Sequence, residues 1–370
     1  MASSLEVRLC VNNLLEETEK MIRVSTGQPA ILIARSECSS AFSGYLNMLP
    51  AELVDMILER VDIESLMKFT ASCRAGREAV HSLTTFREVY EYAFPTLVAL
   101  RQTRLWLYHS ISTVNLALRS SSCVSCGNYG PYLFLPTIER CCGYCLRENT
   151  TLWLLSDCEA AAIFDPSNES LANYQIFYAT KGRCSFDMEL VSVKTVKKLA
   201  LKDHGSEAAL HNIDLEPFFP FIDQKLALVL RTTPLESHGY RYSRLHEDID
   251  PVQDQYAGMG SIEFPTFIRR EQRIETIYWC NSCQRTALIL APYKKTLERF
   301  DWPAAGPDAG LLDRMARQAR TRDDALAHHE VCPVVDYANT DFEAIKDHAD
   351  KIDVTREFLR ILARFLRSVA

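Results

Sequence analysis

Residues 47–80 read NMLPAELVDMILERVDIESLMKFTASCRAGREAV, and this stretch decides the fold of the N-terminal part of the chain. Pro50 suits the first position of a helix, where the N–H that proline lacks would have no partner anyway. Leu53, Ile57 and Val61 recur every four residues and predict one apolar helix face. The segment therefore predicts a helix that begins near Pro50.

Two further helices are expected in the same segment. Asp62 is a suitable N-cap for the second helix. The apolar face of that helix contains Leu66, Phe69 and Cys73, and a third short helix ends near Val80. Three helices within about 35 residues cannot bury all of their apolar surface among themselves. Some of that surface must face another body, either the rest of this chain or a partner protein.

The three predicted helices carry a sequence pattern that resembles an F-box. The matching positions are Leu49-Pro50, Glu52-Leu53, Ile57-Leu58, Leu66 and Cys73-Arg74. Gly76 departs from the pattern, because many F-boxes have Trp or Leu there, and it would weaken the third helix. The resemblance implies docking to the Skp adaptor subunit of SCF ubiquitin ligases. The residues expected at that contact are Leu49, Pro50, Leu53, Ile57, Leu58, Leu66 and Phe69.

Length and composition limit the class of protein. The 370 residues predict two to three domains at roughly 150 residues per domain. Hydrophobic residues make up 47% and charged residues 24%, which excludes a wholly disordered or fibrous chain. The net charge of −7 gives no general attraction for nucleic acid or anionic membranes. We expect no membrane span and no secretory signal, and hence a cytoplasmic or nuclear protein.

The 13 cysteines occur largely in pairs, and in a reducing compartment such pairs indicate metal binding before disulfides. Cys123-x2-Cys126 and Cys142-x2-Cys145 are 15 residues apart, a spacing typical of a four-thiolate zinc site. Each turn presents two thiolates on one side, so that two turns complete a tetrahedron. Cys141 competes with Cys142, because it also lies within reach of Cys145. The alternative interpretation is a set of buried free thiols.

A second set of possible zinc ligands consists of Cys280-x2-Cys283 and, after 44 residues, His328-x3-Cys332. Thr321 predicts the start of a helix, on which His328 and Cys332 point to one face. With the C-x2-C turn these two residues make four ligands, although His329 could replace His328. An insertion rich in proline and glycine at residues 302–310 accounts for the long gap.

Motifs outside the F-box segment extend the resemblance to a large family of fungal F-box proteins whose substrates are unassigned. The matching stretches are residues 134–137, 140–146, 199–206, 279–283 and 326–332. The resemblance spans residues 45–335 and supports both zinc sites. It identifies no substrate, because function in this family is itself inferred mainly from the F-box.

The sequence contains no recognisable catalytic motif. Nucleotide-binding loops, the dinucleotide fingerprint, HExxH and GxSxG are all missing. Ser65 and Lys68 fit a hydrolase pattern, but they lie inside the predicted F-box without its partner motifs. We therefore predict no catalytic residue and no enzyme. Two alternatives remain, namely a zinc-dependent protein- or nucleic-acid-binding module outside any ligase, and a metalloenzyme with an open zinc site.

The expected fold is α+β and mainly helical, in five segments. These are an N-terminal segment and linker (1–43), the F-box (44–84), a helical linker (85–118), a zinc-stapled module with short strands (119–335) and a C-terminal amphipathic helix (336–370). Within them we expect a helix in residues 1–20, a helix at 192–204 closed by Gly205, a helix interruption at Pro95, and strands at 132–135, 260–264 and 274–283. The predicted function is an adaptor that docks the Skp subunit and recruits an unknown protein substrate.

Overall fold

The computed structural model describes residues 9–10, 22, 48–167, 176–180, 187–213, 224–236, 256, 258–281, 283–284 and 315–332. Its contacts divide the chain into two units, residues 19–275 and residues 1–18 with 276–370. The predicted module at residues 119–335 therefore falls across both units. The linker at 22–43, the insertion at 302–310 and the C-terminal helix lie outside the described residues, apart from Ile22.

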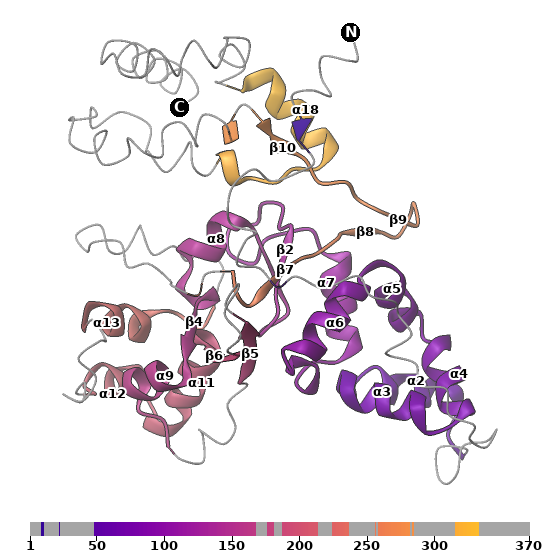
Figure 1. Cartoon of the computed structure of the whole chain (residues 1–370), viewed down its shortest axis with the longest axis horizontal. Coiled ribbons are helices and arrows are strands. Elements are labelled where there is room, and N and C mark those ends of the chain that lie inside the picture. The colour runs from indigo at the N-terminus through magenta and orange to yellow at the C-terminus, as the bar shows by residue number, and fades with distance from the viewer. Residues whose placement is uncertain are drawn as a thin grey trace. The chain divides into compact units, whose positions relative to one another are not determined.

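The unit of residues 19–275 begins with a group of helices, drawn in indigo to purple in Figure 1. They are α2 (Ala51–Leu58), α3 (Ile63–Ser72), α4 (Arg74–Ser82), α5 (Thr84–Tyr92), α6 (Phe94–Gln102), the 3-10 helix η4 (Leu105–Leu107) and α7 (Ile111–Arg119). The three helices predicted for residues 47–80 are confirmed, as is the cap, because Asp62 Oδ1 accepts from Ser65 N at 2.8 Å. The helix interruption falls at Ala93, and Pro95 instead lies in the first turn of α6.

Two small antiparallel sheets follow the helices. In the first, β2 (Tyr132–Phe134) lies between β3 (Glu139–Cys141) and β7 (Ser261–Glu263). In the second, β6 (Asp187–Ser192) lies between β4 (Leu154–Ser156) and β5 (Phe177–Thr180). The predicted strands at 132–135 and 260–264 are thereby confirmed. A two-stranded hairpin, β8 (Phe267–Ile268) with β9 (Arg273–Ile274), completes the sheets of this unit.

Further helices accompany the second sheet. They are α8 (Gly143–Glu148), η5 (Thr150–Leu152), α9 (Asp157–Phe164), α11 (Val193–His204), α12 (Glu207–His211) and α13 (Gln224–Thr232). Gly205 ends α11 at φ 78°, which is the left-handed region that favours glycine and confirms the predicted helix end. A separate hydrophobic core, with Leu155, Ile163 and Val196 among its members, lies between this sheet and its helices.

One continuous core joins the N-terminal helices to the first sheet. It contains Val54 and Leu66 from the predicted F-box, Leu118 from α7, and Phe134 and Cys145 from the first cysteine region. No break in packing therefore separates residues 44–84, 85–118 and the start of the predicted zinc module. Each group alone is too small to bury its own apolar surface, which explains the shared core.

Arg140 on β3 ties several segments of this core together. Its guanidinium is buried and donates to the carbonyl oxygens of Gly130, Ala117, Pro265 and Phe264 at 2.8–3.0 Å and to Thr266 Oγ1 at 2.9 Å. Burial lowers the pKa of Arg140 to about 10, so the group stays charged at neutral pH. Because all five donors of the guanidinium are used, the buried cation is satisfied without a carboxylate partner.

In the unit of residues 1–18 and 276–370, strands from the two ends of the sequence pair with each other. β1 (Leu9–Cys10) is antiparallel to β10 (Trp279–Cys280), with Leu9 opposite Cys280. Leu9 and Cys10 were expected in a helix, and this prediction was wrong, because β10 supplies a strand partner that local sequence does not reveal. A single strand was predicted at 274–283. The structure instead has two short strands there, β9, which ends at Ile274, and β10 at Trp279–Cys280. Helix α18 (Arg322–Val331) completes the described part of this unit.

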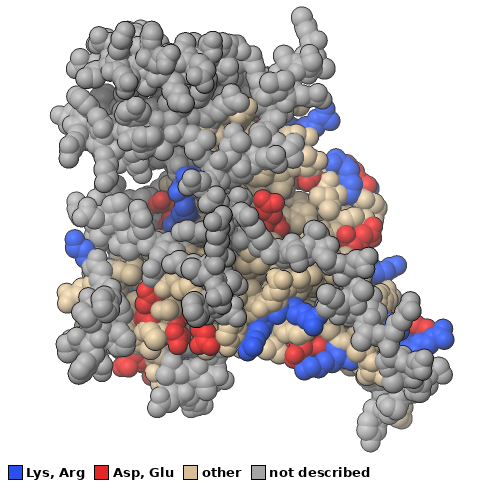
Figure 2. Space-filling model, in the orientation of Figure 1, with Lys and Arg blue, Asp and Glu red and all other residues tan. Residues whose placement is uncertain are grey.

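The described residues thus form a mainly helical α+β structure with small antiparallel sheets. Acidic and basic residues are interspersed on the face shown in Figure 2. None of the described helices has the length and apolar character needed to cross a membrane.

Candidate metal centres and an exposed helix face

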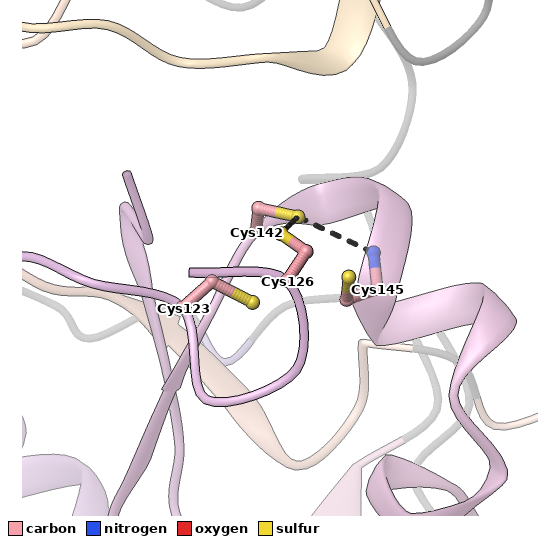
Figure 3. A group of neighbouring side chains, drawn as sticks. All are labelled: Cys123, Cys126, Cys142 and Cys145. Carbon is pink, nitrogen blue, oxygen red and sulfur yellow. Dashed lines mark hydrogen bonds between the residues drawn. The ribbon is translucent and has the colours of Figure 1, made fainter. Parts of the chain in front are cut away.

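The first predicted cysteine set comes together as a compact group of four sulfur atoms (Figure 3). The Sγ atoms of Cys123, Cys126, Cys142 and Cys145 all lie within 4.8 Å of one another. Those of Cys126 and Cys142 are 3.8 Å apart. A tetrahedral ion with metal–sulfur bonds of about 2.3 Å also separates its sulfurs by about 3.8 Å. The group therefore has the spacing that a single bound metal ion requires.

Local backbone structure directs these sulfurs toward one point. Cys123 and Cys126 lie in a tight turn after α7, which is closed by a hydrogen bond from Gly127 N to Cys123 O at 2.9 Å. Gly127 has φ 75°, which is accessible to glycine at no steric cost. Cys142 is the N-cap of α8, and its Sγ accepts a hydrogen bond from Cys145 N at 3.4 Å. This hydrogen bond holds the Cys142 side chain at the start of α8.

The structure decides between Cys141 and Cys142. Cys141 lies on β3 opposite Tyr132, and its Sγ donates to Tyr132 O at 3.8 Å. The Cys141 sulfur is not a member of the group of four sulfur atoms. Cys142, one residue further on, contributes the fourth sulfur.

The cysteine pKa values in the first group diverge because neighbouring thiols share protons. Hydrogen bonds from the neighbouring thiols, that of Cys123 first, hold the pKa of Cys126 far below its usual value. The hydrogen bond with Cys123 raises the pKa of Cys145 far above its usual value. Hydrogen bonds from adjacent S–H groups thus favour one thiolate in the group. The negative charge of that thiolate makes it harder for the other three thiols to lose their protons. A bound divalent cation would remove this opposition by offsetting the negative charge.

The second predicted set also comes together, within the unit of residues 1–18 and 276–370. The ligand atoms of Cys280, Cys283, His328 and Cys332 lie within 4.8 Å of one another. Cys332 Sγ is 3.6 Å from the sulfurs of both Cys280 and Cys283. Cys283 Sγ is 3.4 Å from His328 Nε2. Ligands of a tetrahedral ion with thiolate and imidazole donors are separated by about 3.5–3.8 Å, so this group also suits one metal ion.

Helix α18 supplies two ligands of the second group. Its N-cap is Thr321, whose Oγ1 accepts from Asp324 N at 3.2 Å, as the sequence predicted. His328 lies within the helix, and Cys332 is the residue that caps its C-terminal end. His328 lies with the three cysteines, and the side chain of His329, the alternative ligand, lies outside the described residues.

A buried arginine beside the second group was not predicted from the sequence. Arg320 is 4% exposed, and its backbone forms a bridge with Tyr278, next to β10. Burial lowers the pKa of Arg320, while the charges of Cys283, Cys280 and Cys332 act in the opposite direction. A cation here offsets the negative charge of the thiolates. The sequence gives one indication that Arg320 lies near the second group, because it directly precedes Thr321, the N-cap of the helix that carries His328.

Helix α2 exposes much of the apolar stripe that the sequence predicted. Leu53 is 44% exposed and Ile57 46% exposed, and Leu49 and Pro50 are also exposed. The opposite side of the helix, with Val54, is buried in the core. Two neighbours extend the exposed face, namely Met48 at 78% and Met56 at 50% exposure. Met48 was missed as a contact residue, although it directly precedes the Leu-Pro pair.

Three other residues expected at the partner contact lie differently. Leu58 is 4% exposed and Leu66 is fully buried, and both belong to the core of this chain. Their assignment to the contact surface is therefore corrected, because neither presents surface for a partner to cover. Phe69 is half-buried and packs against the same core.

Comparisons with known proteins found no relative of this chain. No model of a protein family, no curated protein and no solved structure matches it.

Proposed function

We propose that this chain is an F-box adaptor, which docks the Skp subunit of an SCF ubiquitin ligase and recruits another protein as substrate. The observation that carries the proposal is an exposed apolar face, which consists of Leu53, Met56 and Ile57 on α2 together with Met48 and Leu49 just before it. A contiguous apolar face of this kind is typical of an interaction site, whereas isolated exposed apolar residues are ordinary. The similarity of residues 47–80 to an F-box names the Skp subunit as the partner.

We further propose that both ligand groups bind zinc and serve a structural role. Four thiolates, or three thiolates with one imidazole, form the donor sets that structural zinc prefers. Cys145 and Cys283 are fully buried, so each ion would be largely enclosed by its protein ligands. A closed tetrahedral site leaves no coordination position for a substrate. In this proposal the protein binds the substrate, and other subunits of the ubiquitin ligase carry out the reaction.

A binding experiment with the purified Skp subunit tests the proposed function. Aspartate at both Leu53 and Ile57 would place two charges in an apolar contact, at a cost of several kcal/mol. We expect the double variant to bind the Skp subunit at least 100-fold more weakly than the unmodified chain, as measured by titration calorimetry.

The matched control places aspartate at Leu116 and Leu228, which are 69% and 49% exposed on other helices. This variant carries the same added charge and should bind the Skp subunit normally. Circular dichroism and metal content should be unchanged in both variants, because the substituted side chains contribute little to the core. Equal affinity of the L53D/I57D variant and the unmodified chain would show that α2 is not the docking face.

A further inference from the structure

A second surface of the 19–275 unit combines arginine with aromatic side chains. It lies where α6 ends and η4 begins, beside strand β5, and consists of Arg101, Arg104, Trp106, Tyr108 and Tyr178. Figure 2 shows Lys and Arg atoms between the places that β5 and α6 occupy in Figure 1, with Asp and Glu atoms beside them. We call this group the arginine–aromatic surface.

Aromatic rings hold both guanidinium groups in defined positions. Arg104 Cζ lies 4.3 Å from the centroid of the Tyr178 ring, and Arg101 Cζ lies 5.4 Å from that of Trp106. The backbone adds a second tie, because Tyr178 N donates to Thr103 O at 3.3 Å. Stacking of a cation on an aromatic face contributes roughly 0.5–1 kcal/mol at an exposed site, and it restricts the side chain. The surface is therefore partly organised before a ligand arrives.

Arg104 has an unusual backbone conformation at this position. Its φ of 62° and ψ of 8° lie in the left-handed region, where a residue with a side chain is disfavoured by roughly 1–2 kcal/mol. Glycine or asparagine would adopt this conformation more easily. An arginine that remains here despite the strain has its guanidinium aimed over Tyr178, which suggests that the side chain has a use.

The Arg104 guanidinium is available to a ligand. The residue is exposed, and within the described part of the chain its side chain makes no ion pair or hydrogen bond. The ring lies on one side of the guanidinium, and no hydrogen bond or ion pair within the described residues occupies its N–H groups. A guanidinium binds a carboxylate well, because its N–H groups can form two parallel hydrogen bonds with it.

Apolar surface adjoins the arginines. Leu107 is 43% exposed and Tyr108 is 42% exposed, and Trp106 between Leu105 and Leu107 is half-buried. Tyr, Trp and Arg are the residue types that dominate binding energy at protein interfaces. A ligand that suits this surface carries an anionic group next to an apolar side chain.

Charge decides between a peptide and a nucleic acid as the ligand. The chain carries a net charge of −7, which repels a long polyanion. Glu189 lies directly opposite Tyr178 across the β5–β6 pair, is exposed, and forms no ion pair with Arg104. A nucleic acid needs a continuous track of cations for its phosphates, and an acidic residue inside the track opposes binding. A short peptide with one or two carboxylates avoids most of this repulsion.

We propose that the arginine–aromatic surface binds an acidic peptide segment of another protein, with a carboxylate on Arg104 and an apolar side chain against Leu107 and Tyr108. The inference deepens the proposed function, because it assigns the recruited substrate to a class by its chemistry. The role of the bound protein as a substrate rests on the proposed adaptor function, whereas peptide binding itself requires no ligase.

The test is a selection of random twelve-residue peptides displayed on phage against the full-length, zinc-loaded protein. We expect selected peptides to be enriched in Asp or Glu beside Leu, Phe or Trp. The most enriched peptide is then synthesised with a fluorescent label, both as selected and with its acidic residues replaced by amides. The amide form should bind at least tenfold more weakly in fluorescence anisotropy.

Variants of the protein connect binding to this surface. Arg104→Gln should weaken the acidic peptide at least tenfold, whereas the matched control Arg87→Gln, an exposed arginine on α5, should change affinity less than twofold. Glu189→Gln should strengthen binding about two- to threefold by removing a like charge. Selected peptides without acidic enrichment, or equal weakening by Arg104→Gln and Arg87→Gln, would overturn the inference.

Two further measurements separate this inference from its alternatives. A labelled twenty-nucleotide single-stranded RNA should bind weakly and independently of Arg104, and Arg104-dependent RNA binding tighter than peptide binding would overturn the peptide assignment. The L53D/I57D variant should retain peptide binding. An unmodified chain that binds the acidic peptide but not the Skp subunit would contradict the proposed function alone. An unmodified chain that binds the Skp subunit but no acidic peptide would overturn this inference alone.

Discussion

Gly76 in α4 shows how a single residue can be read differently in sequence and in structure. Its absence of a side chain was expected to weaken the third helix. The structure shows instead that a Cβ atom at this position would lie 2.7 Å from Phe69 O and 3.3 Å from Cys73 Sγ. Helix α4 therefore approaches the end of α3 more closely than any residue with a side chain allows.

The close approach predicts that Gly76→Ala is destabilising. Alanine ordinarily stabilises a helix relative to glycine by about 1 kcal/mol, but overpacking against backbone costs about 1–3 kcal/mol. We expect a net loss of up to about 2 kcal/mol in the free energy of unfolding, measured by urea denaturation. Ala75→Gly, the reverse change at the adjacent position, controls for helix propensity and should cost about 1 kcal/mol. A Gly76→Ala variant more stable than the natural chain would show that the helices can separate without cost.

Strand β1 shows what a short element contributes. The strand has two residues, and one of them, Leu9, pairs directly with Cys280, a residue of the second metal group. On the other side of the same segment, Tyr278 and Arg320 exchange backbone hydrogen bonds of 3.0 and 2.9 Å. The segment that carries Cys280 is thus paired on both sides, which fixes the direction of its sulfur.

Removal of β1 should therefore loosen one metal centre and spare the other. A chain that lacks residues 1–12 leaves β10 with an unpaired edge, so that Cys280 is held less firmly. We expect the second centre to release zinc to a chromogenic chelator at least tenfold faster, seen as one accelerated phase of two in stopped-flow absorbance. The phase assigned to the first centre by Cys126→Ser should keep its rate. Two unchanged phases would mean that β1 does not support the site.

At the scale of the whole molecule, the two metal groups belong to different units. The first lies in the unit of residues 19–275, where its cysteines share a core with α2–α7. The second lies in the unit of residues 1–18 and 276–370. Metal loss from the first group should therefore destabilise the proposed docking helices, whereas metal loss from the second group should not.

This arrangement predicts distinct consequences for two cysteine variants. The natural chain should carry two zinc ions by plasma mass spectrometry, and Cys126→Ser and Cys283→Ser should each lose one. Structural zinc contributes about 10–16 kcal/mol of apparent binding energy, more than the stability of a typical domain. Cys126→Ser should thus increase amide exchange in α2–α4, while Cys283→Ser leaves it unchanged.

Cys158→Ser, at an exposed cysteine outside both groups, serves as the control and should retain both ions. Natural protein with less than one zinc ion and freely titratable thiols would return these cysteines to the interpretation of buried free thiols. Equal exchange in α2–α4 for Cys126→Ser and the natural chain would mean that apolar packing alone holds this core.

Local features of this protein follow from the sequence by itself. The Asp62 cap, the end of α11 at Gly205 and the pairing of Cys123 with Cys126 depend on residues only a few positions apart. Short spacings restrict the backbone enough for such features to be predicted. The two ligand sets were predictable for the same reason, because each is built from close pairs.

Only the tertiary structure decided which side each of several side chains faces. Leu58 and Leu66 fit the contact pattern as well as Leu53, but both are buried in the core of this chain. The choice of Cys142 over Cys141, the place of Arg320 and the pairing of Leu9 with Cys280 likewise depend on segments that are distant in sequence. Packing between distant segments buries one face of a helix or strand and leaves the other face exposed. A local sequence pattern does not show which of the two faces is buried.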